Sequence, residues 1–141
     1  MPEFSIHDSS ELSDAEVIDL YESVGWTSYT AEPAVLLRAI RGSAFVVACR
    51  NDAGTLVGLA RAISDDATIC YIQDILVNPA FQASGAGRAM LKAIQSRYGH
   101  VRQTVLITDN EAGQRAFYEA LGFTEGSDFR PEPLRMFAVF R

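Results

Sequence analysis

Hydrophobic positions in the first part of the chain recur every three or four residues, which is the spacing of one face of a helix. The stretch Ser13-Asp-Ala-Glu16 has the sequence of a capping box, in which a serine and a glutamate satisfy free N–H groups at a helix start. The apolar residues that follow on one helical face are Val17, Leu20, Tyr21 and Val24. Gly25 ends this helix, and Pro33 and Gly42 are placed to open and close a second one. We therefore expect a short strand over residues 3–7 and then a layer of two helices.

After this layer the pattern changes to runs of apolar and β-branched residues, which are typical of strands. Residues 43–50 and 55–63 form two such runs, and Asn51-Asp-Ala-Gly54 between them is a hairpin turn sequence. A third run covers residues 67–77. These three segments predict consecutive antiparallel strands.

The second half of the chain alternates between helical and strand patterns. The apolar residues at helical spacing after the third run are Met90, Leu91, Ile94 and Tyr98. Residues 101–108 predict a strand, and residues 111–121 predict a helix that Gly122 ends in a left-handed conformation. The remaining apolar stretches predict final strands over residues 123–124 and 134–140.

This order of elements predicts an α+β fold with a mixed, mostly antiparallel sheet flanked by helices, in a single domain over residues 1–141. A net charge of −6, from 18 acidic and 12 basic residues, argues against a nucleic-acid partner. The charge either favours a cationic small substrate through steering or only keeps the surface soluble. No apolar run approaches the roughly 20 residues that span a membrane, so we expect no membrane partner. The N-terminus lacks the features of a signal peptide, so we expect a cytoplasmic protein.

Cysteine and histidine positions add little chemistry. Cys49 and Cys70 fall inside predicted strands, and we expect them to be buried thiols rather than a disulfide. His7 and His100 are isolated and lack the spacing of metal ligands, so the sequence predicts no metal site.

The segment Gln82-Ala-Ser-Gly-Ala-Gly-Arg88 links a predicted strand to a predicted helix and is the most informative part of the chain. Glycines allow close approach to a phosphate, and the first N–H groups of the helix point toward it. A dinucleotide fingerprint requires a third glycine where Met90 stands, and a Walker loop requires lysine and serine or threonine where Arg88 and Ala89 stand. An anion site and a plain tight turn are the interpretations left open.

The Gln-x-x-Gly-x-Gly pattern over residues 82–87, together with Arg115-Ala-Phe-Tyr-Glu-Ala-Leu-Gly-Phe123, resembles the GNAT superfamily of acyl-CoA N-acyltransferases. The resemblance extends over about residues 12–125 and is strongest over 71–123. It implies a GNAT-like fold and acetyl-CoA as co-substrate. In the family the loop grips the pyrophosphate, which implies that role for Gln82, Ala83, Ser84, Gly85, Ala86, Gly87 and Arg88. For the Arg88 side chain, a phosphate contact and a solvated position are both open.

The resemblance also assigns a role to the strand before the loop. The end of that strand splays from its neighbour at a bulge, and the pantetheine arm pairs with it like an added strand. The residues that this implies as cofactor contacts are Ile75, Leu76 and Val77. A backbone N–H near Leu76 is expected to polarise the acyl carbonyl.

Within the second motif, Tyr118 matches the tyrosine that the family commonly uses as general acid, and Phe117 is expected to line the cofactor groove. A phenol with a pKa of about 10 can protonate the departing CoA thiolate; a tyrosine at the edge of the core is the alternative. The family often has a pantetheine-binding asparagine seven residues before the tyrosine. Here that position is Glu111, with Asn110 one residue earlier, and either cofactor contact or helix capping is open for Asn110.

The reaction also needs a base, because only a neutral amine attacks the thioester. Asp74 is a carboxylate in an otherwise apolar strand beside the expected acyl position. Burial makes a carboxylate bind a proton more readily, which suits a base. An ion pair within the sheet is the alternative role for Asp74, and Tyr71, Gln73 or a water chain are alternative bases.

An aromatic group precedes the second helix and is expected to bind the acceptor. Its members are Tyr21, Trp26 and Tyr29. The segment from Leu20 to Trp26 resembles family members that acetylate small amines, including plant serotonin N-acetyltransferases, and such rings can stack on an amine or hold a cation. Packing within the helical layer is the alternative.

These observations predict an N-acetyltransferase that moves the acetyl group of acetyl-CoA to a small-molecule primary amine. Direct attack is expected because no cysteine is placed to carry the acyl group. A non-catalytic acyl-CoA-binding module and a protein or peptide N-acetyltransferase are the alternatives. A homodimer built through the last predicted strand is a further hypothesis.

Overall fold

The computed structural model describes residues 4–8 and 11–141 of the chain. The contacts within it divide the chain into two compact units, Met1–Ile107 and Thr108–Arg141.

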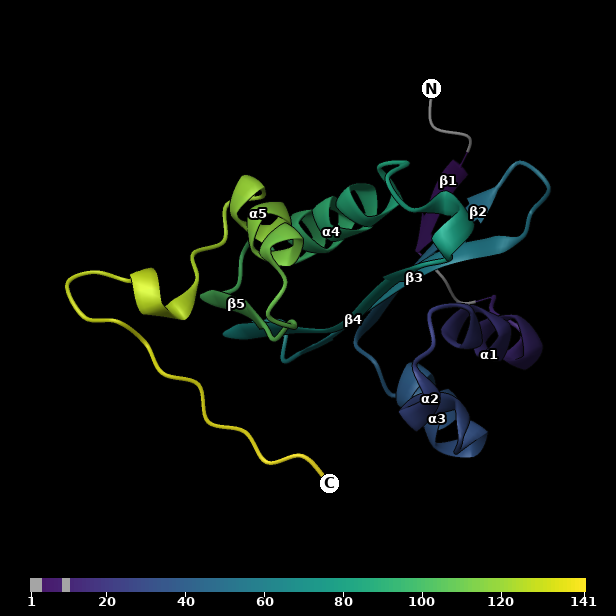
Figure 1. Ribbon diagram of the computed structural model, residues 1–141, viewed down its shortest axis with the longest axis horizontal. Coiled ribbons are helices and arrows are strands. Elements are labelled where there is room, and N and C mark those ends of the chain that lie inside the picture. Colours follow the sequence, from purple (N-terminus) through teal and green to yellow (C-terminus); the bar gives the residue numbers. More distant parts are fainter. Residues whose placement is uncertain (1–3, 9–10) are drawn as a thin grey trace. The chain divides into compact units, whose positions relative to one another are not determined.

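The first unit holds a five-stranded sheet with helices on both of its faces (Figure 1). Its elements are β1 (Phe4–Asp8), α1 (Asp14–Ser23), α2 (Thr27–Thr30), α3 (Pro33–Arg41), β2 (Phe45–Asn51), β3 (Leu56–Ser64), β4 (Ile69–Val77), the 3-10 turn η1 (Pro79–Phe81), α4 (Ala86–Arg97) and β5 (Gln103–Leu106). The strands lie in the order β1-β2-β3-β4-β5, and each of the first four pairs antiparallel with the next. Because β5 runs parallel to β4, the sheet is mixed and mostly antiparallel, which confirms the predicted fold class.

Local sequence signals start and stop these elements as expected. Ser13 and Glu16 form both bonds of the capping box at the start of α1. The side chain of Asn51 accepts hydrogen bonds from the backbone N–H groups of Ala53 and Thr55, and Gly54 has φ +81, so the predicted hairpin turn is confirmed. Within the described residues, no helix is both long and apolar enough to cross a membrane.

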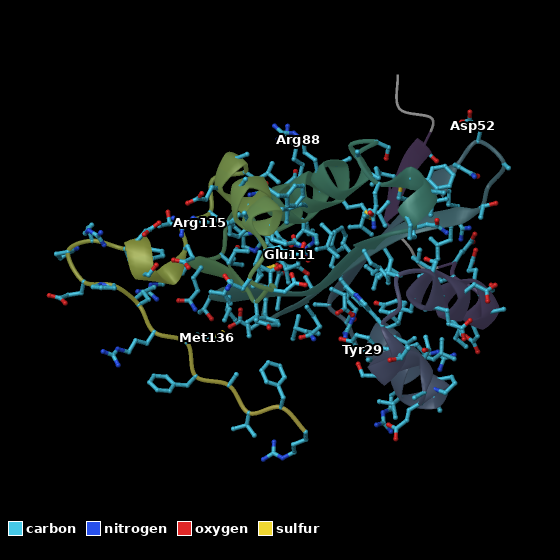
Figure 2. All side chains as sticks on the ribbon, in the orientation of Figure 1. Tyr29, Asp52, Arg88, Glu111, Arg115 and Met136 are labelled. Atoms are coloured by element: carbon cyan, nitrogen blue, oxygen red, sulfur yellow. The ribbon has the colours of Figure 1, made fainter. Side chains whose placement is uncertain are left out.

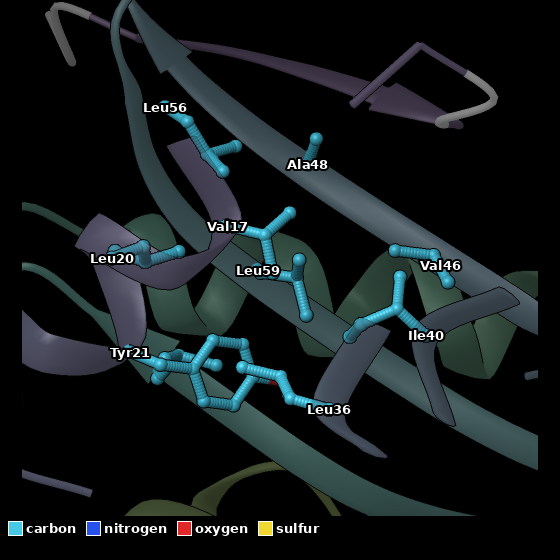
Figure 3. Packing of buried hydrophobic residues seen from close by; sticks show 10 residues of the cluster. Val17, Leu20, Tyr21, Leu36, Ile40, Val46, Ala48, Leu56 and Leu59 are labelled. Atoms are coloured by element: carbon cyan, nitrogen blue, oxygen red, sulfur yellow. The ribbon is translucent and has the colours of Figure 1, made fainter. Parts of the chain in front are cut away.

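One hydrophobic cluster forms between α1, α3 and one face of the sheet (Figure 3). Its buried members are Val17, Leu20, Tyr21, Leu36, Ile40, Val46, Ala48, Leu56, Leu59 and Leu76. Helix α4 covers the opposite face, and a Cβ added at Gly58 would lie 3.0 Å from Met90 Cε and 3.1 Å from Cys49 Cβ. The glycine therefore allows α4 to approach β3 closely, and the buried apolar area on both faces stabilises the sheet.

Three expectations for the helices and strands are wrong. The aromatic loop after α1 contains a further helical turn, α2, so the helical layer has three members. Residues 123–124 and 134–140 form no strand, because a strand requires a hydrogen-bonded neighbour and β-propensity alone does not supply one. In the second unit the described elements are α5 (Ala112–Ala120) and the 3-10 turn η2 (Gly126–Asp128).

Candidate active site

A β-bulge in β4 organises the polar residues at the centre of the first unit. Arg61 of β3 pairs with Asp74, and the next residue, Ala62, pairs with Ile72. Gln73 is therefore an extra residue with no partner opposite it on β3. Such bulges bend a strand and redirect side chains, and they are frequent next to active sites.

The bulge changes which side chains share a face of the sheet. Directly paired residues of neighbouring strands point to the same face. Arg61 and Ile63 lie two apart on β3 and share a face, so their partners Asp74 and Tyr71 share it too. In a regular strand, residues three apart would point to opposite faces. The bulge therefore brings two polar residues of β4 onto the face covered by α1 and α2.

The carboxylate of Asp74 is buried and is the acceptor at the centre of a polar network. Arg61 Nε donates to Asp74 Oδ2 over 2.6 Å, and the two residues are only 5% and 4% exposed. The Tyr21 hydroxyl donates to the same oxygen and the Tyr29 hydroxyl to Oδ1, each over 2.9 Å. The carboxylate is thus in an ion pair within the sheet, and its role as a base stays a prediction.

The network shifts the proton affinities of its members. Burial acts to lower the pKa of the Arg61 guanidinium, but the charge and hydrogen bond of Asp74 outweigh it and raise that pKa. Burial raises the pKa of the Tyr21 phenol well above its usual range, and the negative charge of Asp74 raises it further. Burial also raises the pKa of Tyr71, with smaller contributions from Tyr29 and Asp74. These groups keep their protons at neutral pH.

The aromatic residues expected at the acceptor site pack against one another beside this network. The ring centroids of Tyr21 and Tyr29 lie 5.3 Å apart, and Trp26 lies 5.9 Å from Tyr21 and 6.1 Å from Tyr29. Tyr21 is fully buried, whereas Trp26 and Tyr29 are partly exposed. Tyr29 extends from α2, and its hydroxyl also accepts a hydrogen bond from Gln73 Nε2 over 3.2 Å (Figure 2). Of the three aromatic residues, only Trp26 and Tyr29 therefore present surface to an acceptor.

The glycine loop has the backbone shape of an anion site. Ala83 and Gly85 both have positive φ values, of 63° and 91°, and Gly85 is the residue before α4. The Ser84 hydroxyl accepts from the N–H of Ala86 over 3.4 Å, and the first-turn N–H groups of α4 have no acceptor within the helix. Residues 82–85 are exposed. Free N–H groups on an exposed loop at a helix start suit a phosphate group.

Two side chains of the loop differ in their surroundings. The amide of Gln82 donates to the carbonyl oxygen of Val77 over 3.3 Å, which fastens the loop to the end of β4. Arg88 is exposed and points away from α4 in Figure 2, so its side chain is accessible to a phosphate or to solvent.

The second half of β4 has an open edge. Strand β5 pairs only with residues Ile69–Ile72 of β4, and no strand in the described part of the chain pairs with Gln73–Val77 on that side. This separation is the splay expected before the loop. Backbone groups of Ile75–Val77 that face this open edge can pair with an extended ligand in the manner of an added strand.

The second unit contains the tyrosine expected to act as an acid. The Phe117 and Phe123 rings meet the Tyr118 ring edge-on, with centroids 5.0 and 5.8 Å away. Burial raises the pKa of Tyr118 to about 12, and the charge of Asp109 adds to this shift. The phenol is therefore protonated at neutral pH and can donate a proton.

The start of α5 shows whether Asn110 caps this helix. The residue at the N-cap position is Glu111, and no side chain caps this helix. The interpretation of Asn110 as a helix cap is therefore wrong. The cofactor contact remains a prediction.

Arg61 was missed by the sequence reasoning, although a signal for it existed. It is the only charged residue in the apolar run of β3, and Asp74 is the only charged residue in β4. Single opposite charges in consecutive antiparallel strands are natural partners, because burying either one alone is costly.

Comparisons with known proteins agree on one kind of domain. The family model of the acetyltransferase (GNAT) domain matches residues 41–125, more than half of the chain. An uncharacterized N-acetyltransferase, ycf52 of Porphyra purpurea, is 29% identical over 126 residues, which cover 83% of this chain and 71% of that protein. Histone acetyltransferase TAP1 of Glycine max is 30% identical over 129 residues, covering 78% of this chain and 52% of that protein. The solved GNAT family acetyltransferase SP0256 of Streptococcus pneumoniae TIGR4 aligns with a TM-score of 0.81 and 25% identity over 98% of both chains.

Proposed function

Since this chain belongs to the GNAT family of acetyltransferases, we propose that it moves the acetyl group of acetyl-CoA to the primary amine of a small molecule. The observation that carries this proposal is Tyr29, a partly exposed residue beside Trp26 whose hydroxyl donates a hydrogen bond to the buried Asp74. Aromatic surface beside a proton-accepting group suits a compact amine with an apolar part.

The residues of the first unit fit acetyl-CoA as a substrate. The N–H groups of the loop at residues 82–88 are the proposed partners of the pyrophosphate, supported by the positive φ values of Ala83 and Gly85. The open edge at Ile75–Val77 is the proposed partner of the pantetheine arm. The backbone N–H near Leu76 is proposed to polarise the thioester carbonyl.

Direct attack by the amine is supported by the state of both cysteines. Cys49 and Cys70 are buried in the sheet, and burial raises the pKa of each thiol to about 11. A buried neutral thiol is a poor nucleophile, so neither cysteine is suited to carry the acetyl group. The amine nitrogen therefore forms its bond to the acetyl carbon while the bond to the CoA sulfur breaks.

Two side chains are proposed to move the protons of this reaction. Asp74, or a water that it orders, accepts the proton that leaves the amine. Tyr118 protonates the CoA thiolate, a role that rests on the family motif and on a phenol that keeps its proton at neutral pH. Phe117 and Asn110 are proposed as cofactor contacts on the motif alone.

A lysine side chain of a protein is the second candidate acceptor. The observation that favours it is the similarity to the Glycine max relative, whose name identifies a histone acetyltransferase. The net charge of −6 suits a cationic peptide as well as a cationic small amine.

The proposal is tested by measuring CoA release from acetyl-CoA with separate acceptors. The panel contains arylalkylamines, polyamines, amino sugars, amino acids and a lysine peptide. We expect the largest kcat/KM with a small amine. A peptide with a larger kcat/KM than every small amine would favour a protein lysine as the acceptor. No CoA release with any acceptor, together with no stabilisation of the protein by acetyl-CoA, would refute both candidates.

A further inference from the structure

We propose that Tyr29 is a catalytic residue that passes the proton of the amine to Asp74. This inference rests on the proposed function and deepens it by assigning the path of one proton. Asp74 is only 4% exposed, so an acceptor amine has little direct access to its carboxylate. Tyr29 is partly exposed and contacts Asp74 through its hydroxyl, so it is the group through which an amine can reach the base.

The two carboxylate oxygens of Asp74 have different tasks. Oδ2 accepts from both Arg61 and Tyr21, which are buried. Among the described residues, Oδ1 accepts a hydrogen bond from Tyr29 alone. A carboxylate oxygen has room for more than one hydrogen, so Oδ1 is the oxygen that can take up an additional proton.

The hydrogen bonds around Tyr29 fix the direction in which its proton points. Gln73 Nε2 donates to the Tyr29 oxygen, and an ionised carboxylate only accepts. The Tyr29 hydrogen therefore lies toward Asp74 Oδ1. The phenol oxygen receives the Gln73 amide and also interacts with the Arg61 guanidinium, and the proposal requires an N–H group of the acceptor to approach this oxygen from its remaining side. The bulge that directs Gln73 and Asp74 toward the same tyrosine is what creates this arrangement.

The proposed step balances without any further reactant. As the bond from nitrogen to the acetyl carbon forms, the nitrogen becomes cationic and its N–H becomes far more acidic. That proton moves to the Tyr29 oxygen while the phenol proton of Tyr29 moves to Asp74 Oδ1. Tyr29 is neutral before and after the step, and Asp74 changes from carboxylate to carboxylic acid. The proton returns to solvent by the reverse path after the product has left.

Other titratable groups that face this pair do not compete for the proton. Tyr21 on α1 and Tyr71 on β4 both have raised pKa values, mainly through burial, and remain neutral phenols. Arg61 on β3 remains charged, because the charge of Asp74 raises its pKa despite burial. Among these groups, Asp74 is therefore the proposed acceptor of the proton, because its Oδ1 has the Tyr29 hydroxyl as its hydrogen-bond donor.

The structure offers a matched pair of variants for the test. Tyr29→Phe and Tyr21→Phe each remove one hydroxyl that donates to Asp74 over 2.9 Å, but only Tyr29 is accessible. With the best acceptor of the panel, we expect Tyr29→Phe to lower kcat at least about 10-fold more than Tyr21→Phe, because a proton-transfer group typically contributes 10²–10⁴-fold. The dissociation constant of acetyl-CoA should be the same in both variants.

A pH profile separates proton transfer from a structural role. The kcat deficit of Tyr29→Phe should narrow between pH 7 and pH 9, since hydroxide replaces the lost base. If Asp74→Asn folds, the double variant with Tyr29→Phe should have the same kcat as the slower of the two single variants. The two effects should not add, because both substitutions interrupt the same step.

A deficit that is constant with pH, or a Tyr29→Phe variant as active as Tyr21→Phe, would overturn the relay while leaving the acetyltransferase function intact. A wild-type protein inactive toward every amine would overturn the proposed function and the relay with it.

Discussion

The guanidinium of Arg61 and the carboxylate of Asp74 form a buried ion pair 2.6 Å apart, between strands β3 and β4. The pair lies directly at the bulge, where the register of the two strands shifts. It places one negative charge under the α1–α2 layer and neutralises it from the neighbouring strand. The Asp74 carboxylate also accepts hydrogen bonds from two tyrosine hydroxyls. The stability of the sheet and the proposed chemistry therefore both depend on Asp74.

Loss of Arg61 should strongly destabilise the protein. Arg61→Ala leaves Asp74 buried without its partner, and breaking a buried pair in this way typically costs about 3–5 kcal/mol. Denaturant unfolding should show this decrease. Arg41→Ala is the matched control, because Arg41 pairs with Asp14 over 3.0 Å at side chains that are 66% and 61% exposed. Its unfolding free energy should change by less than about 1 kcal/mol. Equal losses in the two variants would contradict the role of the buried pair.

Gly85→Ala should weaken binding of acetyl-CoA more than it weakens the fold. Gly85 has φ +91, and an added Cβ would contact nothing within 4 Å, so the only penalty is a left-handed backbone of about 1–2 kcal/mol. Relief of that strain changes the loop, and we expect the dissociation constant for acetyl-CoA to rise at least about 10-fold.

Gly54→Ala is the matched control for this variant. Gly54 has φ +81 and equally open surroundings, but it lies in the hairpin between β2 and β3. The melting temperature of Gly54→Ala should fall as much as that of Gly85→Ala. Calorimetry should find the same dissociation constant for acetyl-CoA in Gly54→Ala as in the wild type. Equal binding by the two variants would remove the glycine loop from the proposed cofactor site.

Tyr118→Phe should lower kcat by about 10²-fold or more with little change in acetyl-CoA affinity, because general acid catalysis contributes about 10²–10⁴-fold. An acid must be protonated to act, so activity that depends on it is lost as the pH rises through its pKa. With the pKa of Tyr118 raised to about 12, the wild-type kcat should have no falling limb from this phenol up to pH 9.5. A falling limb near pH 9 that Tyr118→Phe abolishes would contradict the raised pKa.

The ion pair at the start of α1 should make stability depend on acid pH. Hydrogen bonding to Arg50, with contributions from the Ser13 cap, lowers the pKa of Glu16 from 4.5 to about 2. A lowered carboxyl pKa stabilises the fold above the unfolded pKa, and that contribution disappears as the pH falls from about 4.5 to about 2. Glu16→Gln keeps a capping side chain but removes the charge.

We expect Glu16→Gln to lower the free energy of unfolding by about 1–2 kcal/mol at pH 7, after allowance for side chains that are 22% and 26% exposed. The difference from wild type should shrink steadily in denaturation curves recorded toward pH 3. A gap that is independent of pH would contradict the assignment of this stability to the charge of Glu16.

Local signals made most of the fold predictable. The capping box at Ser13 and Glu16 and the turn over residues 51–54 each specify geometry within a few residues of sequence, and both were located correctly. The strand, loop and helix around Gly85 were also predictable, because a glycine that can adopt a left-handed conformation stands next to the first residue of α4. Strand order followed from short connections between consecutive elements.

Long-range pairing accounts for what the sequence did not reveal. The bulge at Gln73 depends on the register between β3 and β4, and a single inserted residue leaves no mark in the alternation of apolar positions. The contact of Tyr29 with Asp74 joins residues 45 apart along the chain. Leu134, Phe137 and Phe140 have strand-forming character, yet they are exposed and unpaired as strands in the described structure. The hypothesis of a dimer through that segment therefore has no strand to build on.

The proposed acetylation of a small amine is tested most directly by a competition in one reaction between a small arylalkylamine and a lysine peptide for limiting acetyl-CoA. The products are identified by mass spectrometry. We expect acetylation of the primary amine of the small molecule ahead of the peptide, with one CoA released for each acetyl group transferred. Acetylated peptide without acetylated small amine would contradict the proposed acceptor. CoA release without either product would contradict amine acetylation itself.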